Sequence, residues 1–431
     1  MRKVYISIIC VILFFQNSFA ITLPEALLQA YKNNPELNAE RENIEVSKED
    51  LNISKSEYLP SVTLSGSKSR ENTDKLTNQS GVDQSINDAN PLTQSIKIEQ
   101  TLIDFGRKAD LQKNKIGINL ASAKLKKKEQ EILLKAIEAY TGLMLANKKF
   151  KISQNNLNLL ERQVETDQAR LERGQITLVD LAQSEASFAG AQAKYIEFRN
   201  EITTKKLNYE NIIGPIDNIN SLETKSNTNI ILPENLEKAI EISKKNNPDL
   251  IIAKLEYNQS EKDFIIARSE LSPSAKLSFE NSRSEDFSSS YDERNKNTLK
   301  ASITWPIYSG GKNIASVNKN KNLKKRKKLL LDSAFKTNDT NVASVWSILQ
   351  SSKSLLNSVK SQVKAAEIAN EGITVEYESG LGRSTLDVIQ SNSILLDSKI
   401  TLANSERNYL LSQFRLLQSV GLLTSDYLKL K

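Results

Sequence analysis

Apolar residues recur every seven positions along two neighbouring stretches of the first half of the chain. They flank Gly174, with Phe150, Leu157, Val164 and Leu171 before it and Leu181, Phe188, Tyr195, Ile202 and Tyr209 after it. A seven-residue apolar repeat is typical of a helix that packs along a coiled-coil seam. The pattern therefore predicts two long helices joined by a glycine-containing tip at residues 171–181.

The same arrangement returns in the second half, with a tip predicted at residues 377–388. The seam that follows this second tip keeps the register of the first: Val388, Leu395, Leu402, Tyr409 and Leu416. Asp180 and Asp387 each lie immediately before the first seam residue of the helix that follows the tip. Gly380, however, lies one residue further from that seam residue than Gly174 does. The sequence thus predicts an internal duplication whose second turn has gained one residue.

Serine occupies the position three residues after each apolar seam residue of the last predicted helix. The series is Ser391, Ser398, Ser405, Ser412 and Ser419. Small residues at alternate seam positions let helix backbones approach closely, so we expect these serines to be buried. A solvated polar face is the alternative.

Elsewhere the spacing of apolar residues changes from helical to alternating, which is typical of strands with one apolar and one polar face. Val62 and Leu64 alternate with serine and threonine, and Ile96 and Ile98 alternate with charged residues. We predict strands at about 58–68, 93–104, 273–283 and 297–307, with a polar loop at about 67–92. Three glycines are expected at strand-to-helix junctions: Gly106, Gly310 and Gly311.

These patterns predict a mainly α-helical fold with a small β part, organised as two structural repeats. The first repeat would cover residues 21–213, a polar linker 214–231, and the second repeat 232–431. Between Gly106 and Gly174 there is no proline, so this stretch predicts one long helix or two stacked ones.

Strands of about ten residues with one apolar face have the length that crosses a bilayer at a tilt. Four such strands cannot close a barrel, and an open edge in hydrocarbon leaves backbone groups without hydrogen bonds. Three chains would supply twelve strands, enough to leave a lumen. Two chains would supply eight strands, whose interior is filled by side chains, so we expect several chains to contribute to one barrel. A homotrimer would continue the transmembrane β-barrel into an α-helical barrel or tunnel.

Residues 1–20 have the basic start, short apolar run and small final residues of a secretory signal peptide. The single cysteine, Cys10, lies within it, and the chain has no histidine. Ser-His, Cys-His and histidine-metal sites are therefore excluded, and we expect no catalytic residue, metal or cofactor. The net charge of +7 is spread along the chain and does not point to a nucleic acid partner.

Two lysine-rich runs, Lys124–Lys128 and Asn318–Lys328, fall at matching depth on the two longest predicted helices. A solvated helix surface is the favoured interpretation. Binding of anionic lipid headgroups, or lining of a tunnel wall, is the alternative.

The chain resembles the TolC-type outer-membrane efflux and secretion channels. The resemblance rests on Asn34-Pro-Glu-Leu37, on Tyr58-Leu-Pro-Ser61, on the glycine after the second strand of each repeat, and on the paired tips. It implies a trimer with a twelve-stranded barrel in outer-membrane lipid of a Gram-negative bacterium and a periplasmic tunnel. Such a protein is the passive exit duct of a tripartite efflux or type I secretion system. A periplasmic adaptor and an inner-membrane pump of ABC or RND type open it. A secreted or periplasmic structural coiled coil without a pore remains the alternative.

The resemblance also implies roles for residues at the tips. Adaptors of the family grip the turns, which here are Arg173, Gly174 and Gln175 in the first and Ser379, Gly380 and Leu381 in the second. A closed-state lock would join Tyr377 and Arg383 to an acceptor expected at Asp180. Asp387 would form a single acidic ring, because Gln390 stands where the family often has a second acid. Ordinary helix caps and surface polar groups are the alternative for these residues.

Overall fold

The computed structural model describes residues 21–71, 75, 77–83, 90–222, 230–288 and 291–430. The predicted signal peptide, residues 1–20, lies outside the described residues, as do parts of the predicted loop 67–92 and linker 214–231. In chain order the elements are α1 (Leu23–Asn33), α2 (Pro35–Ser56), β1 (Ser61–Lys68), β2 (Leu92–Ile103), α3 (Arg107–Glu172), α4 (Leu178–Ile212), a 3₁₀ turn (Ile219–Ser221), α5 (Leu236–Asn246), α6 (Pro248–Ser269), β3 (Ser274–Ser288), β4 (Tyr291–Thr304), α7 (Lys312–Glu378) and α8 (Thr385–Ser419).

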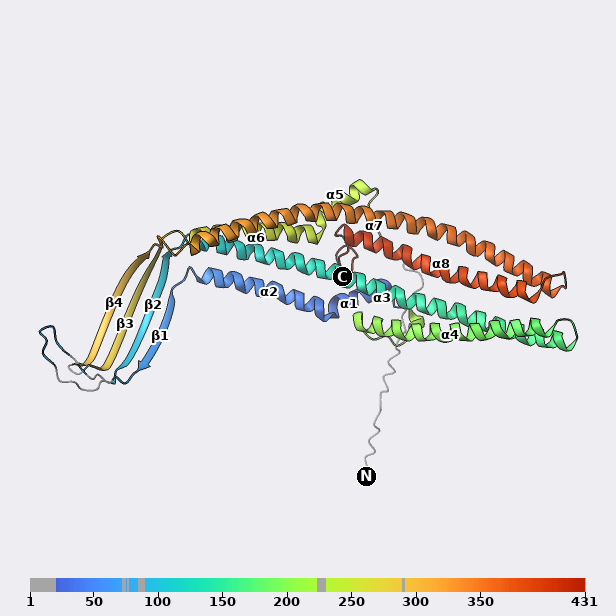
Figure 1. Ribbon diagram of the computed structural model, residues 1–431, viewed down its shortest axis with the longest axis horizontal. Coiled ribbons are helices and arrows are strands. Elements are labelled where there is room, and N and C mark those ends of the chain that lie inside the picture. Colours follow the sequence, from blue (N-terminus) through green and yellow to red (C-terminus); the bar gives the residue numbers. More distant parts are fainter. Residues whose placement is uncertain are drawn as a thin grey trace, which may run out of the picture. The chain divides into compact units, whose positions relative to one another are not determined.

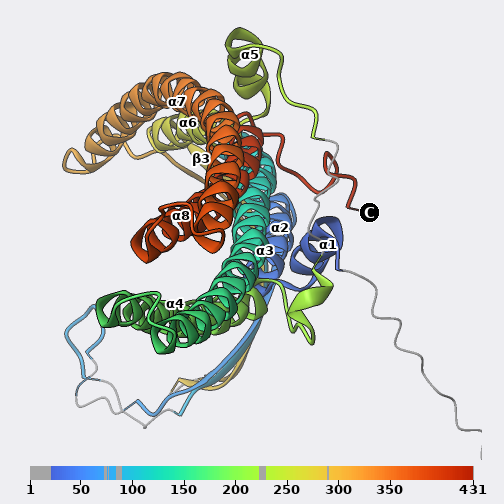
Figure 2. The same cartoon turned by 90° about the vertical axis from the view of Figure 1, so that its right-hand side faces the viewer.

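The element order repeats once: two helices, two strands, one very long helix and a shorter return helix. Helices α3 and α7 have 66 and 67 residues, and α4 and α8 have 35 each. In both repeats the return helix lies beside the long helix that precedes it (Figures 1 and 2). The predicted duplication is confirmed, and the stretch after Gly106 forms one helix rather than two.

The chain divides into two compact units. One consists of residues 1–38, 128–243 and 340–431, and the other of residues 39–127 and 244–339. The first unit holds the hairpin tips and the second holds the sheet. In the part of the chain that the structure describes, no helix combines the length and the apolar run needed to cross a membrane.

The sheet is antiparallel with the order β1-β2-β3-β4, which Figure 1 shows as four adjacent arrows. Its register places apolar residues opposite one another across neighbouring strands. Val62 pairs with Ile98, Ile98 with Phe279, and Phe279 with Leu299. Because side chains alternate between faces along a strand, this register collects these apolar residues on one face and places Lys97, Glu99 and Lys276 on the other.

The β3–β4 hairpin is longer than the alternation of apolar residues predicts. Its outer part pairs polar residues: Asn281 donates to Asn297 at 2.6 Å, and Arg283 bridges to Glu293 at 3.1 Å. Such pairs stabilise strands without an apolar signal in the sequence. At the other end β4 stops at Thr304 instead of 307, because Pro306 has no N–H for the ladder.

The core of the unit that holds the tips is an apolar cluster built from α1, α3, α4 and α8. Its largest fully buried side chains include Tyr140, Tyr209 and Phe414. The seam serines of α8 are also buried, with Ser398 only 1% exposed. Burial confirms their assignment to the seam and rules out the solvated face.

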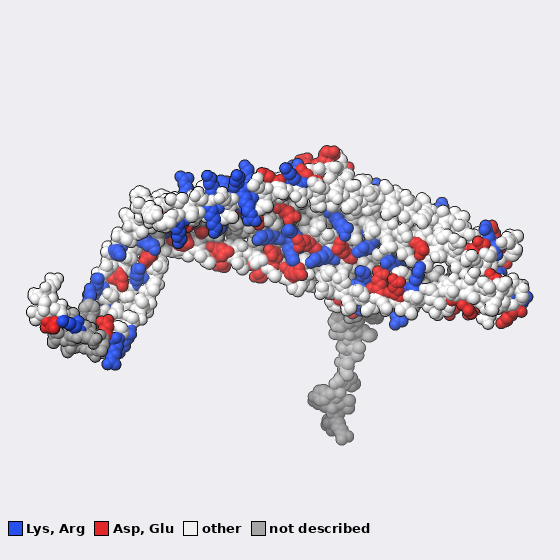
Figure 3. Space-filling view, in the orientation of Figure 1, with Lys and Arg blue, Asp and Glu red and all other residues white. Residues whose placement is uncertain are grey.

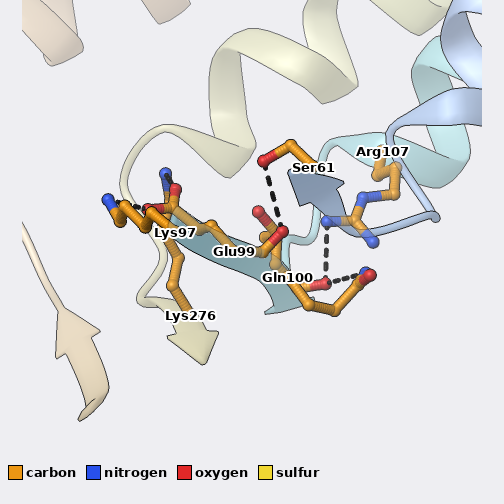
Figure 4. Close-up of polar contacts among 7 residues, drawn as sticks. Ser61, Lys97, Glu99, Gln100, Arg107 and Lys276 are labelled. Atoms are coloured by element: carbon orange, nitrogen blue, oxygen red, sulfur yellow. Dashed lines mark hydrogen bonds and ion pairs between the residues drawn. The ribbon is translucent and has the colours of Figure 1, made fainter. Parts of the chain in front are cut away.

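The strand-to-helix junctions use glycine for two different reasons. At Gly106 a Cβ would overlap the Ser269 hydroxyl, so the position requires close approach. Gly310 and Gly311 have φ of +62° and +82°, a region that favours glycine. Figure 4 shows Arg107, the first residue of α3, donating to the Thr101 carbonyl at 3.1 Å. Its guanidinium also lies 4.8 Å from the centre of the Tyr58 ring.

Figure 4 also shows the charged face of the sheet. Glu99 accepts from Lys97 at 2.6 Å on the same strand and from Lys276 of β3 at 3.0 Å. The Ser61 hydroxyl donates to the Glu99 carbonyl at 3.3 Å, which ties β1 to β2. Opposite charges therefore alternate on the face that carries no apolar row.

Candidate gate and docking site at the hairpin tips

The first tip begins with a glycine cap on α3. Gly174 has φ +69°, and its N–H donates to the Leu171 carbonyl at 2.8 Å. The N–H of the next residue, Gln175, donates to the Arg170 carbonyl at 2.9 Å. These two bonds form a Schellman motif, which satisfies carbonyls at the end of the helix and reverses the chain.

Helix α4 then starts with a capping box. The Thr177 hydroxyl accepts from the Asp180 N–H, and the Asp180 carboxylate accepts from the Thr177 N–H at 2.9 Å and from its hydroxyl at 2.7 Å. The hydrogen bonds from Thr177 lower the pKa of Asp180. The carboxylate is thereby committed to its own helix.

The second tip repeats both devices. Gly380, with φ +72°, and Leu381 form the Schellman bonds, and Ser384 with Asp387 forms the capping box of α8. Its interhelix segment, 379–384, is one residue longer than 173–177 and accommodates a further glycine, Gly382, at φ +81°. The predicted one-residue insertion therefore lies in the turn.

A buried polar cluster joins the two hairpins just behind the tips. Its centre is Asp167 of α3, which is 0% exposed. Tyr377 of α7 donates its hydroxyl to Asp167 Oδ1 at 2.8 Å, and Ser184 of α4 donates to Oδ2 at 2.5 Å. Gln163 donates to both carboxylate oxygens, at 3.1 and 3.0 Å. Side chains from three long helices thus converge on one carboxylate.

Tyr377 is held from two further sides. Its hydroxyl shares a 3.1 Å hydrogen bond with Thr385 of α8, and the Arg170 guanidinium lies 4.4 Å from the ring centroid. Burial is the main cause that raises the pKa of Tyr377. The hydroxyl therefore stays protonated and remains a donor to Asp167.

The expected acceptor, Asp180, is corrected by this geometry. Tyr377 bonds to Asp167, and Arg383 donates its Nε to Glu376 on its own hairpin at 2.6 Å. That bond to Glu376 raises the pKa of Arg383. Asp180 forms neither contact because its oxygens serve the cap at Thr177. Within the single chain Asp180 acts as a helix cap, as Asp387 does in the second tip.

The importance of Asp167 is visible in the sequence through its position on a seam, and not through the tip motifs. Ser153, Leu160 and Asp167 recur every seven residues, interleaved with the apolar seam of α3, and all three are buried. An acid at such a position must find hydrogen-bond donors when the helices pack. A lone carboxylate in a seam, opposite a helix that carries serine and tyrosine, is the pattern to search for.

Asp387 also serves as a cap, since its carboxylate accepts from the Ser384 N–H at 3.0 Å and from the hydroxyl at 2.9 Å. The backbone bond from Ser384 is the largest cause that lowers its pKa. Gln390, almost one turn later, is exposed. The cap leaves the carboxylate ionised and accessible, so it does not conflict with a role as an acidic ring.

The turns themselves present exposed side chains. Arg173, Gln175 and Ser379 are exposed, and Leu381 is 71% exposed. The structure adds three exposed apolar residues on the first turns of the return helices: Leu178, Val179 and Leu386. Exposed apolar groups beside a charged turn form a surface suited to a protein partner.

Among the residues that the structure describes, no group of acidic side chains has the arrangement of a metal site.

Comparison with known proteins gives the particular family. The model of the outer membrane efflux protein family matches residues 26–214 and 239–422. The chain belongs to this family. It is an outer-membrane channel that extends into the periplasm and serves in efflux or secretion.

Two curated relatives span nearly the whole chain. Outer membrane efflux protein BepC of Brucella suis is 25% identical over 419 residues, covering 96% of this chain and 89% of that protein. Alkaline protease secretion protein AprF of Pseudomonas aeruginosa is 22% identical over 428 residues, covering 96% and 87%.

Solved structures show the same fold. A crystal structure of CusC superimposes with a TM-score of 0.78 at 15% identity, covering 94% of this chain and 93% of that one. The outer membrane protein VceC of Vibrio cholerae gives 0.77 at 17% identity, covering 93% and 96%.

Proposed function

We propose that three copies of the chain assemble into a twelve-stranded barrel that continues into a helical tunnel. This assembly is the passive exit duct of a tripartite efflux or type I secretion system. The observation that carries the proposal is a four-stranded sheet with an exposed apolar face and two free edges.

The apolar face of the sheet is so exposed in the single chain that its contact with water is unfavourable. Leu64, Leu299 and Ile303 are 77%, 72% and 78% exposed in the single chain. Within the described part of the chain, β1 and β4 each have a neighbouring strand on one side only. Lipid against the apolar face and pairing of β4 with β1 of the next copy would satisfy both demands.

In this proposal, contacts at the hairpin tips control whether the channel is closed or open. The Tyr377–Asp167 bond ties α7 to α3 and so restrains the two hairpins relative to one another. We propose that it holds the closed state and that docking of a periplasmic adaptor shifts the equilibrium by changing the packing of the hairpins. Asp387 would then line the constriction as a single acidic ring.

The partners proposed are an adaptor and an inner-membrane pump of ABC or RND type. The cargo class follows the pump, since the names of the relatives include both efflux and protease secretion. Arg173 and Gln175 give the first turn a polar character, so we expect an adaptor with a complementary polar or acidic tip.

Oligomeric state and conductance test the assembly. Chemical cross-linking of the protein in mild detergent should give a ladder that ends at three chains, and the trimer should conduct in a planar bilayer. A monomeric native mass without conductance, in protein that stays in solution without detergent, would instead support the structural coiled coil.

Adaptor choice is tested at Arg173. We expect Arg173→Val to weaken binding of the cognate adaptor, measured by pull-down with purified components, while the trimer and its conductance stay unchanged. Leu271→Val, away from the tips, serves as the control. Equal adaptor binding by the native tip and by Arg173→Val would remove the polar turn from partner choice.

A further inference from the structure

The face of the sheet opposite the apolar row carries more positive than negative charge. Residues paired directly across neighbouring strands present their side chains on the same face, so the register assigns each residue to a face. In the regularly paired part of the strands, this polar face carries five cations and two carboxylates: Lys97, Lys276, Arg294, Lys296 and Lys300 against Glu99 and Glu280. Five minus two leaves an excess of three positive charges per chain.

Contacts between side chains agree with this assignment of the polar face. Lys276 of β3 forms an ion pair with Glu99 of β2 at 3.0 Å. The hydroxyls of Ser65 and Ser95 lie 3.1 Å apart, which joins β1 to β2 on the same face. Figure 3 shows Lys and Arg side chains along the strands, with fewer Asp and Glu between them. The polar face is therefore one surface that the register continues onto β4.

Two of the cations, Lys296 and Lys300 of β4, form no ion pair with any residue that the structure describes. Both side chains are exposed, and the residues paired with them on β3 are the serines Ser282 and Ser278. Glu280, between these serines, forms no ion pair in the described part of the chain either. At about 3.3 Å per residue, the Cα atoms of the two lysines lie about 13 Å apart along β4.

Closure of the proposed barrel would not neutralise these two lysines. In the described part of the chain β4 has a neighbouring strand on one side only, and the proposed trimer pairs its other side with β1 of the next copy. The polar face of β1 carries hydroxyl residues alone: Ser61, Thr63, Ser65 and Ser67. The strand that would lie beside Lys296 and Lys300 therefore brings no carboxylate to them.

The remaining charges of the polar face do not reverse its sign. Glu99 is shared by two lysines, Lys97 at 2.6 Å and Lys276 at 3.0 Å. With lipid against the apolar face, the polar face lines the lumen of the barrel, and three copies would repeat each lysine around it. Rings of Lys or Arg side chains are the arrangement by which pores select anions, because fixed positive charge raises the local concentration of anions.

We propose that the barrel is an anion-favouring exit section in which Lys296 and Lys300 attract carboxylate groups of the cargo. The inference rests on the proposed function, because it needs the trimeric barrel. It adds a cargo class to that function, namely solutes or polypeptides that carry carboxylates. The two ends of the channel then differ in sign, since the tip is proposed to carry the acidic ring of Asp387.

Ion selectivity in a planar bilayer tests the inference. The tip must neither close the channel nor contribute its acidic ring, so the reference protein carries Tyr377→Phe, Arg383→Ser and Asp387→Asn. Under a gradient of potassium chloride, its reversal potential should show a preference for chloride. Lys296→Gln with Lys300→Gln in this reference should remove most of that preference.

Two controls separate positive charge in the lumen from charge elsewhere and from side-chain shape. Arg283 follows Ser282, the partner of Lys296, and lies on the opposite face of β3. Arg283→Gln therefore removes one charge at nearly the same level and should leave the reversal potential unchanged, whereas Lys296→Gln alone should shift it. Lys296→Arg with Lys300→Arg keeps the charge and should keep the preference for chloride.

Two probes distinguish the sources of the carboxylate. Oligoglutamate added on the barrel side should reduce the current at low salt, whereas oligolysine should not, and the block should weaken in high salt and in Lys296→Gln with Lys300→Gln. Such block assigns the lysines to acidic polypeptides. Selective permeation of free glutamate, measured with potassium glutamate and without block by the oligomer, assigns them to small organic acids.

The outcomes separate this inference from the proposed function. If the unaltered protein is not a trimer or does not conduct, the proposed function fails and the inference fails with it. If it conducts, but the reference protein shows no preference for chloride or keeps it after Lys296→Gln with Lys300→Gln, the anion-favouring barrel alone is overturned. Equal shifts in Arg283→Gln and Lys296→Gln would overturn it as well, because the cause would then lie outside the lumen.

Discussion

The Tyr377 hydroxyl donates to the Asp167 carboxylate across the interface between the two hairpins, at a distance of 2.8 Å. Tyr377 is 6% exposed and Asp167 is 0% exposed. A buried carboxylate that loses a donor keeps its desolvation cost, at about 1–3 kcal/mol for an unsatisfied polar group. The pair is therefore the contact whose removal should change the relation of the hairpins most.

Tyr377→Phe combined with Arg383→Ser should raise conductance several-fold in a planar bilayer. The phenylalanine keeps the ring beneath Arg170 but removes the donor to Asp167, and the serine removes the bond to Glu376. Tyr308→Phe, which alters an exposed tyrosine near the sheet, serves as the control. If the double variant and the control conduct alike, the cluster has only a packing role.

Asp387→Asn should weaken block of the channel by divalent cations, because it would remove the acidic ring proposed at this position. Asp180→Asn is the matched control, since Asp180 has the same capping role and a pKa shifted in the same direction. Single-channel recording with added divalent cations measures both. Equal loss of block in the two variants would mean that cap loss, and not the ring, is responsible.

The pH dependence of the tips follows from the lowered pKa values of Asp180 and Asp387. A lowered folded-state pKa means that the stabilisation is present above the ordinary pKa of an aspartate and is lost as the pH falls through the lower pKa of the folded state. Amide hydrogen exchange in the first turns of α4 and α8 should therefore be unchanged from pH 7 to 5 and loosen only below about 4. Loosening already near pH 6 would exclude these two caps as its cause.

Periodicity in the sequence was sufficient for most of the fold. The seven-residue seams predicted both hairpins, and the register between the two seams located the extra residue of the second turn. The outer part of the β3–β4 hairpin was not predicted, because its pairs Asn281–Asn297 and Arg283–Glu293 form without an alternation of apolar residues in the sequence. Local patterns show which face is apolar, whereas polar pairing depends on the partner strand.

The candidate site was predicted less completely, for a physical reason. Tyr377 could be located from its distance to the turn glycine, but its acceptor lies 210 positions away in the sequence. The resemblance pointed to Asp180, whose oxygens the structure shows bonded to Thr177. The acceptor of Tyr377 is determined by which side chains pack around each carboxylate, and local sequence does not show that packing.

Two buried tyrosines of the core differ in the hydrogen bonding of their hydroxyls, so their substitutions can be compared directly. Tyr140 donates to the Ile21 carbonyl at 2.9 Å, whereas the Tyr209 hydroxyl has no partner among the described residues. Burial raises the pKa of Tyr209 to about 12. Their rings lie 6.5 Å apart, so both sites share one environment.

Tyr209→Phe should therefore leave the stability unchanged or raise it, because it removes a desolvated hydroxyl. Tyr140→Phe should lower it by about 1 kcal/mol through the lost hydrogen bond. Chemical denaturation in detergent measures both. The opposite order of the two variants would show that the Tyr209 hydroxyl has a partner in the assembled protein.

Gly106→Ala should destabilise the junction between β2 and α3, because its Cβ would overlap the Ser269 hydroxyl. That hydroxyl donates to the Ile266 carbonyl at 2.7 Å, so moving it breaks a bond at the end of α6. Overpacking of this kind costs about 1–3 kcal/mol. Gly66→Ala is the control, since nothing lies within 4 Å of the Cβ it would add.

A second variant separates the steric cause from a general need for glycine. Ser269→Ala removes the overlapping oxygen and leaves its own Cβ at 3.5 Å, an ordinary contact. Gly106→Ala with Ser269→Ala should therefore recover most of the protein's resistance to heat, relative to Ser269→Ala alone. Without that recovery, the glycine would be required for the backbone of the junction itself, and the contact with Ser269 would be incidental.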